Sequence, residues 1–152
     1  MADRRYVSAM VAAGVFAAGI SIGNAWAGGP AGVTDDQFSA VGSGTFADSQ
    51  NDGGSVEVGF SATGATADEA SAAVIAACQA DGGQDCTSDM VTNDNLCIAS
   101  VGDDLTDVVA GGAGITVEAA RQDAIGRAAA SNTPMSPGAL VVISVCPNGE
   151  GQ

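Results

Sequence analysis

Four cysteines constrain what this chain can fold into more than any other feature of its sequence. They are Cys78, Cys86, Cys97 and Cys146. An even number of cysteines in a small exported chain predicts two disulfides, and four cysteines allow three pairings. Cys86 follows Cys78 by eight residues, across a Gly-Gly turn, which favours a local bridge between them. The remaining bridge would then join Cys97 to Cys146.

The first 27 residues have the pattern of an export signal. Arg4 and Arg5 supply positive charge, residues 7–23 are uncharged and mostly apolar, and Ala-Trp-Ala at 25–27 has small residues where a signal peptidase cuts. The alternative is an uncleaved membrane anchor, but the apolar run is shorter than the roughly 20 residues that span a bilayer. We therefore expect cleavage near Ala27 and a secreted or cell-envelope protein.

Charge excludes two classes of partner. The chain has 18 acidic residues against four basic ones and no histidine, for a formal net charge of −14. Nucleic acids and anionic membrane surfaces are bound mainly through lysine and arginine, so we expect neither as a partner. Downstream of the signal the only cations are Arg121 and Arg127, which we expect to pair with nearby acids.

Two regions follow the predicted signal. Residues 28–54 are rich in Gly, Ser and Asp without helical or strand periodicity, which predicts a flexible arm. The alternative is that Phe38 and Phe46 dock on the domain as a loose strand. Residues 55–152 are predicted to form the folded domain.

The folded part begins with a strand and a helix. Val56, Val58 and Phe60 alternate with smaller or polar residues, as in a half-buried strand. Thr66 and Glu69 then form a capping box before an alanine-rich helix that ends at Gly82-Gly83. Short strands are expected at 86–91 and 96–101.

A shift of 50 residues aligns the first helix with a second one. It places Gly64, Thr66, Asp68, Ala70 and Ile75 on Gly114, Thr116, Glu118, Ala120 and Ile125. Residues 139–146 are nearly all apolar and predict either a central strand covered on both faces or the most buried strand of a small sheet. The predicted fold class is α+β: two strand-helix-strand repeats packed as one small sheet, with two alanine-rich helices and two disulfides.

These features resemble the bacterial domain of unknown function 4189 family. The resemblance rests on the helix ending in a cysteine, the G-G-x-x-C after it, the C-I-A strand start, the second alanine-rich helix and the closing cysteine, and it runs from Val56 to Cys146. It implies a small exported protein, and no activity can be inferred from membership in the family. Members usually carry a further bridge near the second helix, where this chain has residues such as Ala128, Ala129 and Leu140.

The available side chains argue against catalysis. Triads and Ser-Lys dyads need histidine or lysine, and the chain contains neither. We expect no enzyme and no cofactor, and predict a non-enzymatic interaction or cell-envelope protein whose partner is an unidentified protein or envelope component. A carboxylate-dependent hydrolase is a distant alternative. The nearer alternative is a calcium-stabilised module, with Asp103, Asp104 and Asp107, joined by Asp94, as candidate ligands.

Overall fold

The computed structural model describes residues 5–11 and 37–147, which form seven strands and two helices. In chain order these elements are β1 (Arg5–Val11), β2 (Phe38–Ala47), β3 (Ser55–Gly64), α1 (Ala67–Ala80), β4 (Gln84–Thr92), β5 (Cys97–Asp103), β6 (Val108–Gly114), α2 (Val117–Ala130) and β7 (Leu140–Val145). The fold class is α+β, as predicted.

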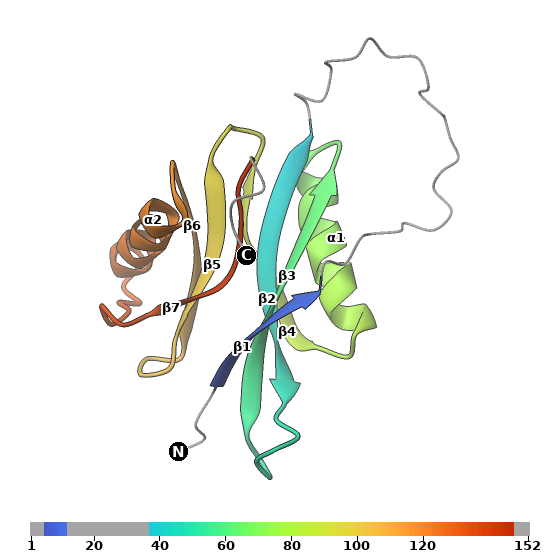
Figure 1. Cartoon of the computed structure of the whole chain (residues 1–152), viewed down its shortest axis with the longest axis vertical. Coiled ribbons are helices and arrows are strands. Elements are labelled where there is room, and N and C mark those ends of the chain that lie inside the picture. Colours follow the sequence, from blue (N-terminus) through green and yellow to red (C-terminus); the bar gives the residue numbers. More distant parts are fainter. Residues whose placement is uncertain (1–4, 12–36, 148–152) are drawn as a thin grey trace.

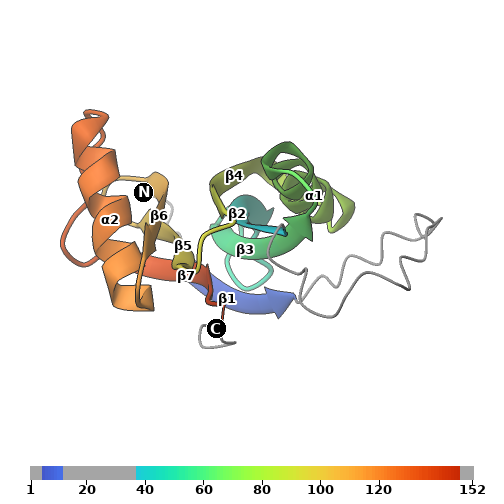
Figure 2. The ribbon, with the colours of Figure 1, turned by 90° about the horizontal axis from the view of Figure 1, so that it is seen from above.

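The strands form two sheets, so the prediction of one small sheet is wrong. The four-stranded sheet has the order β1-β3-β2-β4 and the three-stranded sheet the order β6-β5-β7. The sheets lie face to face, with α1 covering the outer face of the first and α2 that of the second (Figures 1 and 2). Each helix returns the chain to its own sheet, because β4 pairs with β2 and β7 pairs with β5.

The two sheets approach closely where small residues meet larger ones. A Cβ atom at Gly59 of β3 would lie 2.5 Å from Cβ of Ile143 in β7. Val41 of β2 and Ile98 of β5 are fully buried. Hydrophobic periodicity identifies strands but not their pairing, which is why the sequence did not separate one sheet from two.

The prediction of a flexible arm is wrong for its second half. β2 lies inside it and pairs with β3 on one side and β4 on the other, and Ala40 and Val41 are fully buried. The rings of Phe46 and Phe60 stack with centroids 5.9 Å apart. The docked-strand alternative therefore describes this segment better, whereas residues 28–36 lie outside the described residues.

Close packing explains the unusual composition of β2. A Cβ atom at Gly44 would lie 2.2 Å from Sγ of Cys78, and one at Gly42 would lie 2.6 Å from a methyl group of Val74. Both Cys78 and Val74 are buried residues of α1. The glycines let the helix lie against the strand, so the low apolar content reflects close approach rather than disorder.

The last strand does not occupy the expected central position. β5 is central in the three-stranded sheet and all seven of its residues are buried, whereas β7 is an edge strand. No strand is predicted at β6, because its Val-Val-Ala-Gly-Gly-Ala-Gly segment has few large apolar side chains. Its glycines admit α2: a Cβ atom at Gly112 would lie 2.1 Å from the carbonyl oxygen of Ala120.

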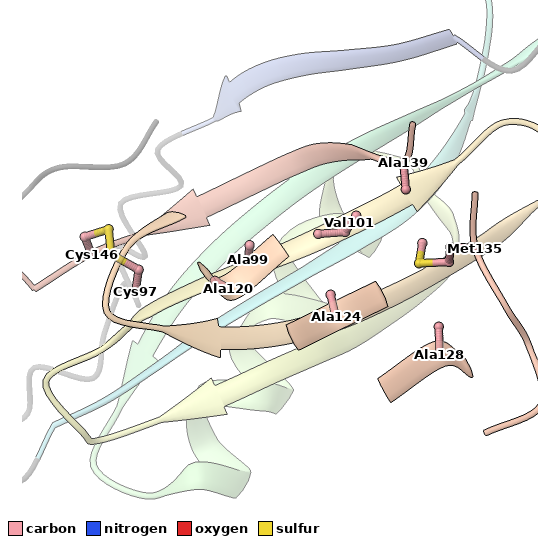
Figure 3. Close-up of a cluster of buried hydrophobic side chains, with 9 residues drawn as sticks. All are labelled: Cys97, Ala99, Val101, Ala120, Ala124, Ala128, Met135, Ala139 and Cys146. Atoms are coloured by element: carbon pink, nitrogen blue, oxygen red, sulfur yellow. A yellow bond between two sulfur atoms is a disulfide. The ribbon is translucent and has the colours of Figure 1, made fainter. Parts of the chain in front are cut away.

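The two helices begin alike and bury small side chains. The Thr66 hydroxyl accepts from the Glu69 N–H and the Thr116 hydroxyl from the Ala119 N–H, each at 3.1 Å. Figure 3 shows the buried face of α2, Ala120, Ala124 and Ala128, against Ala99 and Val101 of β5. Alanine on the helix and glycine on the strand allow short distances between helix and sheet.

The first strand falls inside the predicted signal. β1 pairs in parallel with β3, with Arg5 opposite Val56 and Val7 opposite Val58. The predicted cleavage site at Ala27 lies outside the described residues. Within the part of the chain that the structure describes, neither helix has the length and apolar character to cross a membrane.

Candidate functional site

Two disulfides connect the elements that the sequence singled out. Cys78 at the end of α1 bonds to Cys86 in β4, and Cys97 at the start of β5 bonds to Cys146 just after β7. The Cα atoms lie 5.9 Å and 4.0 Å apart. Two bridges of this kind point to an oxidising, extracellular setting for the protein.

A carboxylate between the sheets accepts several hydroxyl hydrogen bonds. Asp89 of β4 accepts from Thr87 at 2.6 Å and from Ser43 of β2 at 3.3 Å, and Ser100 of β5 donates to it at 2.5 Å. Ser43 and Ser100 are fully buried. This cluster joins the two sheets through polar groups, because its two buried serines come from β2 and β5.

The candidate calcium ligands do not form one site. Asp103 is buried, and its carboxylate accepts from Leu105 N–H at 3.2 Å, from the Thr106 hydroxyl at 2.9 Å, and from both the backbone N–H and the hydroxyl of Ser136. Asp94 precedes β5 and Asp103 ends it, so the strand separates them. Among the described residues no three acidic or cysteine side chains lie close enough to hold a metal ion.

Burial and hydrogen bonding act on the pKa of Asp103 in opposite directions. Burial is the largest influence and raises the pKa, but the bonds from Ser136, Leu105 and Thr106 together outweigh it. The pKa is therefore lowered from 3.8, and the carboxylate stays charged in its buried position.

The two cations of the domain pair with acids on α2, as expected. Arg121 lies 3.0 Å from Glu118, and its guanidinium also donates to the carbonyl oxygens of Pro137 and Ala139 in the loop before β7. Arg127 lies 2.7 Å from Asp123. Asp123 in turn accepts from the N–H of Ala113, which fastens α2 to β6.

A polar pocket of about 720 Å³ lies where the two sheets meet the β4–β5 loop. We call it the amide pocket, and it is lined by Gln37, Ser39, Thr92, Asn93, Asp94, Asn95, Leu96, Val145, Cys146 and Pro147. The Cys97–Cys146 bridge fixes one wall, because Cys146 is itself a lining residue. Pairing of Ser39 with Thr92 holds the start of β2 beside the end of β4.

The chemistry of the amide pocket suits binding by hydrogen bonds. Its described lining residues offer three primary amides, two hydroxyls and one carboxylate, and include no arginine or aromatic ring. Amides and hydroxyls of this kind can form hydrogen bonds with neutral polar ligands or polypeptide. Of the residues that line the amide pocket, the sequence analysis named only Asp94 and Cys146 as candidates. The Asn-Asp-Asn run at 93–95 was the one local signal that could have pointed to the other lining residues.

Comparison with known proteins gives one family match. The family described as Domain of unknown function (DUF4189) matches residues 43–146, more than half of the chain. Neither the curated proteins nor the solved structures gave a match. The matched range includes both helices, both disulfides and most of both sheets. The chain belongs to the domain of unknown function 4189 family.

Proposed function

We propose that the protein is exported, loses residues 1–27, and acts outside the cell or in the cell envelope as a non-enzymatic binding domain. The observation that carries this proposal is the amide pocket, a concave surface lined by hydrogen-bonding side chains and stiffened by a disulfide. Proteins bind ligands in concave sites, where placed polar groups fix the orientation of the ligand.

The lining of the pocket favours binding over catalysis. Hydrolysis by two carboxylates needs a pair about 5 to 10 Å apart, one as acid and one as base or nucleophile. Among the described residues that line the pocket, Asp94 is the single titratable side chain. The other polar groups there, amides and hydroxyls, hold a ligand without exchanging protons with it at neutral pH.

Two further observations support export. The disulfides require an oxidising compartment, and the charged start, apolar run and Ala-Trp-Ala sequence of residues 1–27 have the order of a cleavable signal. The acidic surface keeps the domain soluble and away from nucleic acid and anionic lipid.

The proposal includes an internal duplication of the domain. Helices α1 and α2 each have 14 residues, begin 50 residues apart and follow a threonine cap. Each follows an antiparallel strand pair and leads to a third strand, which gives the orders β3-β2-β4 and β6-β5-β7. The repeated unit is thus strand-strand-helix-strand, one strand longer than the sequence alone indicates.

The test compares two variants with the same change of charge. Asn95→Arg places a long side chain at the exposed rim of the amide pocket, whereas Gln79→Arg places it on the exposed face of α1. Immobilised wild-type protein is incubated with culture fluid and envelope extract, and bound components are identified by mass spectrometry. We expect a component that Gln79→Arg retains and Asn95→Arg loses. Equal capture by both variants, or no capture by wild type, would overturn the proposal.

A further inference from the structure

The outer edge of β3 depends on a segment that the predicted processing removes. β3 pairs with β2 along its whole length, from Ser55 opposite Ala47 to Gly64 opposite Phe38. Among the described residues, its other edge pairs with β1 alone, in parallel, between Val56 and Phe60. β1 covers residues Arg5–Val11 and lies within the predicted export signal.

Cleavage near Ala27, which is part of the proposed function and on which this inference rests, removes the one strand that pairs with this edge of β3 among the described residues. An edge of ten residues presents a row of free N–H and C=O groups. Proteins normally cover or interrupt such edges, because an exposed one pairs with any suitable strand. Residues 56–60 of β3 carry no proline that would prevent pairing.

We propose that the β3 edge of the processed protein is a docking site for an extended segment of another protein, which adds to the four-stranded sheet in the place of β1. β1 shows that the edge accepts a parallel strand, and the sequence of that strand is Arg-Tyr-Val-Ser-Ala-Met-Val. Strand addition of this kind takes its affinity from backbone hydrogen bonds.

The edge also offers a second surface to the incoming strand. β7 contacts both β1 and β3, and Figures 1 and 2 show β1 beside β7 where the two sheets meet. An added strand would therefore bond to β3 and pack along β7 at the same time. This distinguishes the site from a bare sheet edge that faces only solvent.

Charge favours a different protein over a second copy as the occupant. The chain carries a net charge of −14, and two of its four bases leave with the signal. Two copies would bring like charge together, whereas an uncharged or basic segment would not. Pairing of β3 with β3 of another copy is thus the disfavoured outcome of the test.

The test uses the processed protein purified from culture fluid, with its N-terminus determined first. The probe is the end-blocked peptide of residues 5–11, and the matched control has the same side chains with N-methyl groups on alternate amides. Hydrogen exchange of β3 is followed by NMR. We expect the plain peptide to slow exchange of the outward-pointing β3 amides by about tenfold or more, and the N-methylated peptide to have no effect.

Three results would overturn the inference. These are protection by neither peptide, equal protection by both, and β3 amides already protected in a dimer detected by sedimentation. An N-terminus that still includes Arg5–Val11 would instead contradict the export step of the proposed function, and it would be recognised before any peptide is added.

Discussion

The Ser136 hydroxyl donates to the buried carboxylate of Asp103 at 2.9 Å, across 33 residues of chain, and the Ser136 backbone N–H donates to the same carboxylate. Asp103 ends β5 and Ser136 lies in the loop between α2 and β7. The contact therefore ties the β5–β6 turn to the start of the last strand.

Removing this carboxylate should destabilise the domain in a pH-dependent way. We expect Asp103→Ala to lower the free energy of unfolding by about 2 to 3 kcal/mol at pH 7, because hydrogen-bond donors lose a charged acceptor. The pKa of Asp103 in the folded state lies below 3.8. The stability that its carboxylate contributes is therefore complete above that pH and is lost as the pH falls through the folded-state pKa.

Urea unfolding from pH 7 down to pH 2 measures this dependence. The control, Asp94→Ala, removes an equal charge from an exposed position and should change stability by about 0.5 kcal/mol or less. If the difference in free energy of unfolding between wild type and Asp103→Ala stayed constant below pH 3.8, the assigned role of the carboxylate would be contradicted.

Because α2 lies close to β6, replacing glycine by alanine should have opposite effects on stability at two positions. A Cβ atom at Gly112 would lie 2.1 Å from the Ala120 carbonyl oxygen and 2.4 Å from the Ala124 nitrogen, so Gly112→Ala must displace the helix. We expect a loss of about 3 kcal/mol, at the upper end of overpacking costs. Gly126, inside α2, has open space at that position, and Gly126→Ala should stabilise by about 0.5 to 1 kcal/mol. Chemical denaturation measures both, and equal effects would contradict the helix placement.

The parts of the fold with strong local signals were predictable from sequence. Thr66 with Glu69, and the matching Thr116, identified both helix starts, and the 50-residue shift related the two helices. The alternation at Val56, Val58 and Phe60 identified β3. Capping and periodicity are local properties, so a single sequence is enough to reveal them.

The missed parts depend on contacts between distant residues. β2 and β6 carry glycines where a helix or, at Gly42 and Gly111, the backbone of β4 lies against them, and the sequence pattern of such strands resembles that of a loop. The division into two sheets depends on which strands pair, and the amide pocket joins residue 37 to residue 147. Neither leaves a local pattern, which is why only Asp94 and Cys146 of the pocket had been singled out.

The two arginines of the domain should differ in their contribution to stability. The Arg121 side chain is 16% exposed and its Nε donates to the Ala139 carbonyl oxygen at 2.7 Å, whereas Arg127 is 57% exposed and pairs with Asp123 on the surface. Arg121→Lys loses the fork geometry that reaches two carbonyls and should cost about 1 to 2 kcal/mol. Arg127→Lys should cost about 0.5 kcal/mol or less. Thermal melts of the two variants measure the difference. A larger loss of stability in Arg127→Lys than in Arg121→Lys would contradict the prediction.

The longer disulfide should stabilise the domain more than the shorter one. The bridges close loops with sequence separations of 49 and 8 residues, and loop entropy gives about 4 kcal/mol and about 2.5 kcal/mol respectively. Cys146→Ser should therefore lower the melting temperature further than Cys86→Ser, and it should leave Cys97 free to form dimers. Non-reducing peptide mapping checks the pairing, and a fragment that links Cys78 to Cys97 would contradict it.

The most direct measurement is the intact mass of the protein recovered from culture fluid and envelope fractions of cells that express the full chain. The proposed function and the open β3 edge both require an exported chain that begins at or within a residue or two of Gly28. We expect that mass, with both disulfides formed and almost no absorbance at 280 nm, because the chain's single tyrosine and single tryptophan, Tyr6 and Trp26, lie in the removed segment. A chain that retains Arg5–Val11 in its final location would contradict the proposal.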